Sequence, residues 1–89
     1  MTGTGITAEA IRLKLEELLQ PSQLEVIDES AAHMGHAGSD GTGQGTHFRV
    51  RIASPLFDRR SRVARHRLVY DALRSFVLQG LHALAIETL

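Results

Sequence analysis

Residues 47–53 constrain the fold of this chain most, because apolar and polar side chains alternate there without interruption. Three apolar residues alternate with three polar ones, namely Phe48, Val50 and Ile52 with His47, Arg49 and Arg51. Successive side chains of a β-strand point to opposite faces, so the pattern predicts a half-buried strand with a basic outer face. Such a strand needs neighbouring elements that cover its apolar face.

Two segments with helical periodicity can provide that cover. Residues 8–20 follow Thr7, a suitable N-cap, and end before Pro21. Their apolar face consists of Ile11, Leu15, Leu18 and Leu19. Residues 62–79 predict the main helix, which ends before Gly80, where a left-handed C-cap is expected. The apolar stripe of this helix consists of Val63, His66, Val69, Tyr70, Leu73, Phe76 and Val77.

Two more strands and a short turn complete the predicted α+β domain. Residues 24–28 alternate as a short strand, and residues 81–89 are apolar on both faces, as in a central or covered strand. Ser54 and Pro55 resemble an N-cap followed by proline at the first helical position. The first two strands should form an antiparallel hairpin, and a right-handed crossover should make the second and third parallel. The mixed three-stranded sheet then packs against helices on one face.

Length and composition fit one small domain. The chain has 89 residues, of which 43% are hydrophobic, enough for one core. It has no cysteine, which excludes a disulfide scaffold, and no apolar run approaches the roughly 20 residues of a membrane span. Residues 1–7 contain no basic residue and no apolar stretch, so we expect no signal peptide and a cytoplasmic protein.

The net charge is zero, but the charges are distributed unevenly. Residues 1–48 carry a net charge of −5, whereas residues 49–67 carry +6. The arginines of this basic segment are Arg49, Arg51, Arg59, Arg60, Arg62, Arg65 and Arg67. The asymmetry indicates a polar partner surface or phosphate contacts, as in DNA binding, and the alternative is a solvated, self-complementary surface. A net charge of zero argues against strong DNA affinity.

Residues 29–45 form a glycine-rich stretch without periodicity, which contains His33 and His36. A loop of this length in a small domain is usually functional or disordered. Its glycines at 41, 43 and 45 lead into a strand rather than into a helix, and no Lys-Ser/Thr pair follows them. The stretch is therefore a flexible loop and not a phosphate-binding loop.

Taken in order, several segments resemble the BolA family over about residues 6–88. The resemblance is carried by Leu24-Glu25-Val26, Asp28-Glu29-Ser30, His33, His47-Phe48-Arg49-Val50, Arg65-His66-Arg67-Leu68-Val69-Tyr70 and His82-Ala83-Leu84-Ala85-Ile86. It implies one BolA-like domain over residues 1–89, with a flexible stretch 1–6 and the glycine- and histidine-rich loop 29–45. The implied fold is α-β-β-α-α-β, similar to class II KH domains.

The resemblance also implies a function. BolA-like proteins pair with monothiol glutaredoxins, and the heterodimer can hold a [2Fe–2S] cluster in iron–sulfur maturation, trafficking or iron regulation. On this basis His82 is the first expected cluster ligand, and His33 is the second, with His36 as a competing candidate. The glutaredoxin cysteine and a glutathione thiolate would complete the coordination, so we expect no cofactor in the chain alone.

Each histidine has an alternative interpretation. His82 could be a hydrogen-bonded histidine at a strand end, and His33 or His36 could be solvated. A zinc site with His47 is a weaker alternative, because it would lack thiolates. His66 lies on the apolar stripe and is expected to be partly buried and hydrogen-bonded. Arg65 and Arg67 point to opposite flanks of the helix.

Three functional hypotheses remain open at this point. The first is the glutaredoxin-binding adaptor; the second is a DNA-binding transcription regulator affecting stress response and cell morphology, as described for some bacterial BolA proteins; the third is an interaction module without cofactor. The family often has a glycine soon after the position of Phe57, where KH domains carry a GxxG clamp, but here Asp58-Arg59-Arg60 follows. No catalytic set is recognisable, so we expect no enzyme. Alone, the protein should be a monomer or a weak homodimer.

Overall fold

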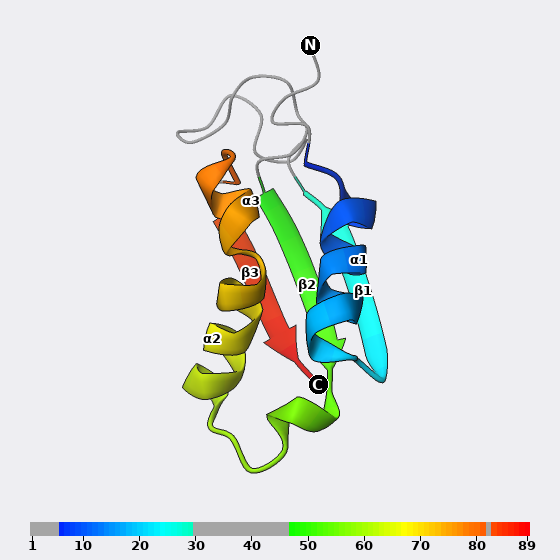
Figure 1. Ribbon diagram of the computed structural model, residues 1–89, viewed down its shortest axis with the longest axis vertical. Helices are drawn as coiled ribbons and strands as arrows, with labels where there is room; N and C mark the ends of the chain where they lie inside the picture. Colours follow the sequence, from blue (N-terminus) through cyan, green and yellow to red (C-terminus); the bar gives the residue numbers. More distant parts are fainter. Residues whose placement is uncertain (1–5, 30–46, 82) are drawn as a thin grey trace.

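The computed structural model describes residues 6–29, 47–81 and 83–89 of the chain. Helices and strands follow one another in the predicted α-β-β-α-α-β order, with a short 3₁₀ turn before the second helix (Figure 1). The elements are α1 (Ala8–Leu19), β1 (Gln23–Asp28), β2 (His47–Ala53), η2 (Pro55–Phe57), α2 (Arg62–Ala72), α3 (Arg74–Leu78) and β3 (Ala83–Thr88). No helix among these elements has the length and apolar character needed to cross a membrane.

The three strands form one mixed sheet in the order β1-β2-β3. Strands β1 and β2 are antiparallel, and β2 and β3 are parallel, so the predicted strand directions are confirmed. Of the two alternatives predicted for the last strand, central or covered, the central position is wrong, because β2 is central and β3 forms an edge. The apolar residues of β3 instead pack against the core from that edge, as Leu84 and Ile86 do.

Both long helical segments lie on the same face of the sheet, with α1 beside β1 and α2–α3 beside β3 (Figure 1). The core fills the space between them and the sheet. It comprises Ile6, Ile11, Leu15, Leu19, Phe48, Val50, Ile52, Phe57, Val69, Leu73 and Leu81. Ile6 is therefore buried, although we expected it in a flexible stretch, while the rest of that stretch and most of loop 29–45 lie outside the described residues.

Helix α1 begins and ends where its capping residues predict. The Thr7 hydroxyl accepts a hydrogen bond from the Ala10 N–H at 3.0 Å, and Gln20 adopts a left-handed conformation at the C-cap before Pro21. Of its predicted apolar face, Leu18 is 47% exposed. The remaining three residues of that face make the contact with the sheet.

The predicted single helix over residues 62–79 is divided in two at Leu73, whose backbone leaves the helical region (φ −103°, ψ 13°). The predicted stripe was also partly wrong. Val69 and Leu73 are buried, but Val63, Tyr70 and Val77 are 68%, 45% and 44% exposed. The segment carries more apolar surface than one side of a helix can bury against the sheet, so the part that faces away from the core stays in contact with solvent.

The end of α3 has the predicted glycine cap. Gly80 adopts a positive φ of 120°, its N–H donates to the Val77 carbonyl, and the Leu81 N–H donates to the Phe76 carbonyl. This pair of hydrogen bonds is a Schellman motif, in which the residue after the glycine turns back to pack on the helix. Leu81 is accordingly buried and belongs to the turn, so β3 begins at Ala83 and not at residue 81.

Candidate functional site

One end of the sheet collects the chain segments that flank the expected histidine ligands. Ala83, the first residue of β3, lies opposite His47, the first residue of β2. The Glu29 N–H donates to the His47 carbonyl at 2.8 Å. Glu29 and His47 are the described residues on either side of residues 30–46, and Ala83 directly follows residue 82. The positions that lead to His33, His36 and His82 therefore meet here, while these three histidines themselves lie outside the described residues.

A hollow opens at this end of the sheet. Its lining consists of Glu29, His47, Phe48, Arg49, Ala83, Leu84 and Ala85. His47 is 7% exposed, although the alternating pattern placed it on the outer face; it lies between Glu29, whose N–H donates to its carbonyl, and Ala83 of β3. Over the described ranges, no three histidine or carboxylate side chains stand close enough to hold a metal ion. A metal centre here would need donors from elsewhere.

Arg49 is fixed beside this hollow by two carboxylates. Its guanidinium donates to Glu29 at 3.0 Å and to Glu87 at 2.8 Å. The hydrogen bond to Glu29, followed by the one to Glu87, raises the pKa of Arg49. The side chain is therefore a permanent, oriented cation at the rim of the hollow.

The ion pairs of Arg49 continue across the open face of the sheet. Arg51 lies between Glu25 and Glu87 in the strand register and pairs with both, at 3.2 Å and 3.4 Å. The predicted basic outer face of β2 is thus matched by carboxylates from β1, β3 and the residue after β1. This arrangement occupies two of the seven arginines that we considered for nucleic-acid binding.

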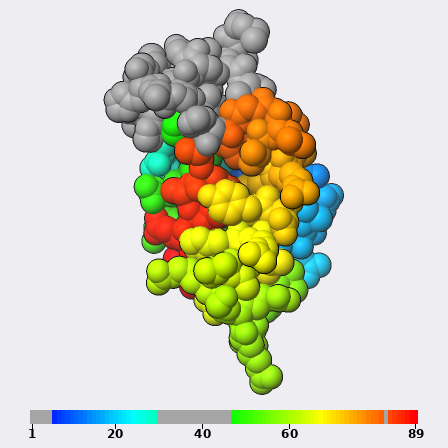
Figure 2. Space-filling model, turned by 90° about the vertical axis from the view of Figure 1, so that its left-hand side faces the viewer, coloured from blue at the N-terminus to red at the C-terminus, as the bar shows by residue number. Residues whose placement is uncertain are grey.

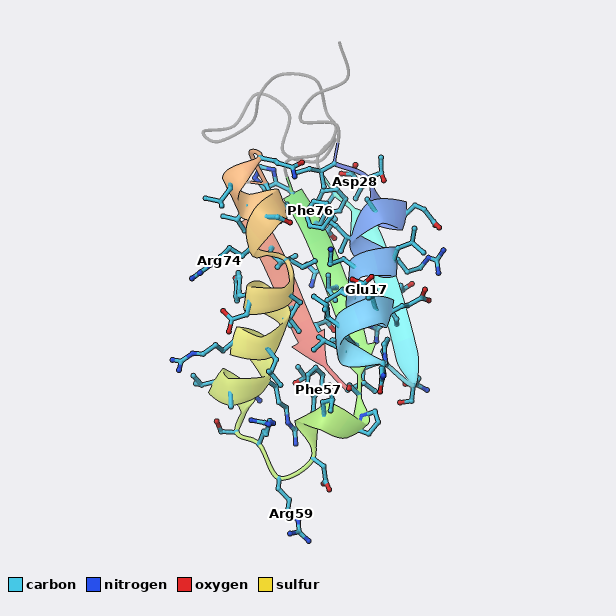
Figure 3. All side chains as sticks on the ribbon, in the orientation of Figure 1. Glu17, Asp28, Phe57, Arg59, Arg74 and Phe76 are labelled. Atoms are coloured by element: carbon cyan, nitrogen blue, oxygen red, sulfur yellow. The ribbon has the colours of Figure 1, made fainter. Side chains whose placement is uncertain are left out.

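The other five arginines lie in the turn after η2 and in α2, and no carboxylate of the described chain pairs with them. They are Arg59, Arg60, Arg62, Arg65 and Arg67. Two of them fix the turn, since Arg60 donates to the Leu56 carbonyl at 2.8 Å and Arg65 to the Phe57 carbonyl at 3.1 Å. Arg59 points away from the body of the protein (Figure 3).

The turn differs from a KH clamp in its sequence. Arg59 has a φ of 61°, a left-handed conformation that favours glycine, and this position follows Phe57 closely. A glycine would adopt this φ without strain, and here an arginine stands in its place. His66 is half-buried as expected, but no hydrogen bond joins it to another residue of the described part of the chain.

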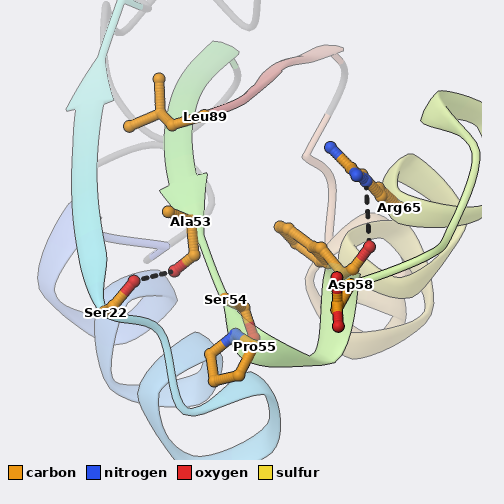
Figure 4. Close-up of a pocket in the computed structure, with 8 residues that line it drawn as sticks. Ser22, Ala53, Ser54, Pro55, Asp58, Arg65 and Leu89 are labelled. Atoms are coloured by element: carbon orange, nitrogen blue, oxygen red, sulfur yellow. Dashed lines mark hydrogen bonds between the residues drawn. The ribbon is translucent and has the colours of Figure 1, made fainter.

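A larger hollow of about 560 Å³ lies at the opposite end of the sheet (Figure 4). It is lined by Ser22, Ala53, Ser54, Pro55, Phe57, Asp58, Arg65 and Leu89. The Ser22 hydroxyl donates to the Ala53 carbonyl at 3.4 Å, and the Ser54 hydroxyl accepts from the Leu56 N–H. The residues that line it include no histidine and no pair of carboxylates, so they do not form a general acid–base pair.

Comparison with known proteins identifies the family. A family model described as BolA-like protein matches residues 15–89. This chain belongs to the BolA-like protein family. The resemblance that we drew from the separate sequence segments is therefore confirmed.

Relatives of this BolA-like chain include bacterial, plant and animal proteins. An uncharacterised Sinorhizobium protein from the cobS 5′ region is 54% identical over 80 residues, which cover 89% of this chain and 85% of that protein. The Arabidopsis thaliana SufE-like protein 1, chloroplastic/mitochondrial, is 52% identical, and mouse BolA-like protein 1 is 45% identical. These matches cover 92% and 93% of this chain, but only 23% and 57% of the plant and mouse proteins.

Solved structures show the same BolA fold. The BolA domain of SufE1 from Arabidopsis thaliana superposes with a TM-score of 0.80 at 46% identity, covering 91% of this chain and 87% of that one. BolA1 from Arabidopsis thaliana gives a TM-score of 0.79 at 44% identity, covering 93% and 89%. The α+β architecture with a mixed three-stranded sheet is therefore shared with these BolA structures.

Proposed function

We propose that this protein is a BolA-like adaptor, which binds a monothiol glutaredoxin and shares the ligation of a [2Fe–2S] cluster with it. Its role would lie in iron–sulfur cluster maturation or trafficking, or in iron regulation. The observation that carries the proposal is the pairing of His47 with Ala83 beside Glu29. Through this contact, the segments that contain the proposed ligands all start from one end of the sheet.

The donor chemistry supports the proposal. Neutral imidazole is a good ligand for iron, and histidine in place of thiolate raises the potential of a [2Fe–2S] centre. The chain has no cysteine, so the remaining ligands have to come from the glutaredoxin cysteine and glutathione. The protein would therefore act as a binding partner rather than as an enzyme, and we propose a cytoplasmic location.

Covalent distance favours His33 over His36 as the second ligand. A chain of n residues spans at most about 3.6 Å per residue. His33 follows Glu29 by four residues, so its Cα stays within about 14 Å of the Glu29 Cα. His36 has a reach of about 25 Å from the same anchor and is less constrained to this end of the sheet.

The test is to mix the protein with a monothiol glutaredoxin, glutathione, iron and sulfide under argon. Visible absorption and circular dichroism should show a cluster spectrum that differs from that of glutaredoxin alone, and size-exclusion chromatography should show a complex. His82→Ala should return the spectrum to the glutaredoxin-only form. His66→Ala, a histidine change on the half-buried face of α2, is the matched control and should leave the spectrum unchanged. The adaptor proposal would be disproved if the spectrum stays that of glutaredoxin alone and no complex forms.

A second candidate function is DNA binding by a transcription regulator of the BolA type. The observation that favours it is the group of five arginines at residues 59–67, which have no carboxylate partner in the described structure. Unpaired arginines can neutralise phosphates, and binding would then weaken with salt. The absence of a glycine clamp and the net charge of zero make this the weaker candidate.

A further inference from the structure

Strand β3 presents an open edge with outward-pointing backbone groups. The Leu89 N–H donates to the Ile52 carbonyl at 2.8 Å, so the odd-numbered residues of this strand direct their backbone groups towards β2. The N–H and C=O groups of Leu84, Ile86 and Thr88 consequently point away from the sheet. From the described elements outside the sheet, one side chain bonds to this edge, since the Tyr70 hydroxyl donates to the Leu84 carbonyl at 3.1 Å.

Helices α2 and α3 border this edge along its length, and Figure 2 shows α2 in yellow next to β3 in red. Two hollows lie between helix and strand. The first is lined by Tyr70, Val77, Leu81, Ala83 and Leu84, and the second by Arg62, His66, Ile86, Glu87 and Thr88. A third, lined by Val63, His66, Arg67 and Tyr70, shares residues with both, so the three form one strip beside the strand edge. We call this strip and the β3 edge together the β3 groove.

The chemistry of the β3 groove is apolar and cationic. Val63, Tyr70 and Val77 remain exposed, and they lie along the groove because Val63 shares one hollow with Tyr70 and Val77 shares another with it. Arg62 and Arg67 are exposed beside them, and no described carboxylate pairs with either. Glu87, the acidic residue of the groove, is already paired with Arg49 and Arg51 on the open face of the sheet. Positive charge in the groove is therefore left without compensation.

We propose that the β3 groove binds an extended, acidic segment of a partner protein as an additional strand of the sheet. The backbone of the segment would pair with Ile86 and Thr88, and with Leu84 once the Tyr70 hydroxyl is displaced. The side chains on the face of the segment towards α2 would include apolar ones, which lie against Tyr70, and carboxylates, which face Arg62 and Arg67. Strand addition of this kind takes affinity from the backbone and specificity from alternate side chains. None of these residues is a proposed cluster ligand, so the inference does not depend on the proposed function.

A second copy of this chain fits the groove less well. Antiparallel pairing of two β3 edges about a twofold axis would place both α2 helices on the same face of the joined sheet. The exposed Arg62 and Arg67 of each copy would then approach the same arginines of the other. Like charges brought together across an interface oppose association, whereas an acidic segment compensates them. The charge pattern therefore selects a different, acidic partner.

The test uses the full ¹⁵N-labelled chain and a capped peptide in which every second residue is serine and the residues between are alternately glutamate and valine, so that both can face α2. We expect chemical-shift changes and slower amide exchange at Ile86 and Thr88 when the peptide is added. Two matched peptides serve as controls, one with lysine in place of glutamate and one with alternate backbone nitrogens methylated. Both should bind at least about tenfold more weakly, because the first reverses the charge and the second removes donors needed for strand pairing.

Protein variants distinguish binding in the β3 groove from non-specific attraction between opposite charges. Arg62→Glu should weaken peptide binding about fivefold, whereas Arg59→Glu, which changes the same charge outside the groove, should change it less than about twofold. Tyr70→Phe should strengthen binding about two- to fivefold, because it frees the Leu84 carbonyl for pairing. The proposal is overturned if Ile86 and Thr88 do not respond, if the lysine peptide binds equally well, or if sedimentation shows that β3 pairs with a second copy instead.

Discussion

His47 and Ala83 lie opposite each other at the first position of the parallel ladder between β2 and β3. Because Glu29 also donates to His47, a single contact point joins the residue after β1 to the beginnings of both other strands. Segments that are far apart in the sequence thus start from one place.

The two loop histidines should contribute unequally to a shared cluster. His33→Ala should alter the visible circular dichroism of the complex with glutaredoxin, because its covalent distance from Glu29 limits its reach more than that of His36. His36→Ala is the matched change and should preserve the wild-type spectrum. If His36→Ala alters the spectrum and His33→Ala does not, the loop ligand is His36, and covalent distance from Glu29 does not select the ligand.

The two groups of arginines should behave differently towards DNA if the second candidate function is correct. Arg67→Ala removes an exposed guanidinium without a carboxylate partner, so the slope of log affinity against log salt should become shallower by about one. Arg51→Ala removes the same charge from a side chain held by Glu25 and Glu87, and should leave the slope unchanged. Fluorescence anisotropy over a salt series measures both. If both variants change the slope equally, DNA binding responds only to the net charge of the protein.

Two leucines of the divided helical segment should differ sharply in their contribution to stability. Leu73 has no exposed surface, and Leu73→Ala should lower the free energy of unfolding by about 2–5 kcal/mol. Leu78 is 82% exposed, and Leu78→Ala should change it by no more than about 0.5 kcal/mol. Urea unfolding followed by circular dichroism gives both values. A similar loss for the two variants would contradict the difference in burial between Leu73 and Leu78.

Gly80 should be intolerant of a side chain. Its φ of 120° is disfavoured for any residue with a Cβ, so Gly80→Ala should destabilise the protein by about 1–2 kcal/mol. Gln79→Ala changes the neighbouring residue, whose φ of −86° suits alanine, and should have little effect. Thermal unfolding compares the two. An unchanged melting temperature for Gly80→Ala would mean that the Schellman motif contributes little.

The first turn of α1 should respond to acid. The hydrogen bond from Arg12 holds the pKa of Glu9 below its ordinary value of 4.5. A carboxyl group with a lowered pKa in the folded state stabilises the fold above its unfolded pKa, and this stabilisation is lost as the pH falls through the folded value. An NMR titration of the Glu9 carboxyl should therefore show a midpoint below the ordinary value. In Arg12→Gln the midpoint should return towards the ordinary value. If the midpoint does not move, the lowered pKa of Glu9 has another cause than Arg12.

Capping residues in the sequence predicted the boundaries of several elements correctly. Thr7, Ser54 and Gly80 mark element boundaries that the structure confirms, because capping depends on a few neighbouring residues. The division at Leu73 was not predictable in this way. An unbroken apolar pattern continues through residue 73, and Leu73 is buried in the core although its backbone leaves the helical region.

The ion pairs on the open face of the sheet could not be predicted from local sequence signals either. The sequence contains Glu25, Arg51 and Glu87, but only the strand register shows that they lie side by side. Without that register, seven arginines form one basic segment. With it, two of them are compensated, and the remaining five form a separate cationic region.

By itself, the sequence determined the element order, the buried face of β2, the capped helix ends and the lack of any thiolate ligand. These features follow from side-chain periodicity, from capping chemistry and from composition, which act over a few residues. The tertiary structure decided that β3 is an edge strand, that Val63, Tyr70 and Val77 remain exposed, and that Glu29, His47 and Ala83 meet at one end. These relations depend on how distant segments share one core, and that is fixed only when the sheet and helices pack together.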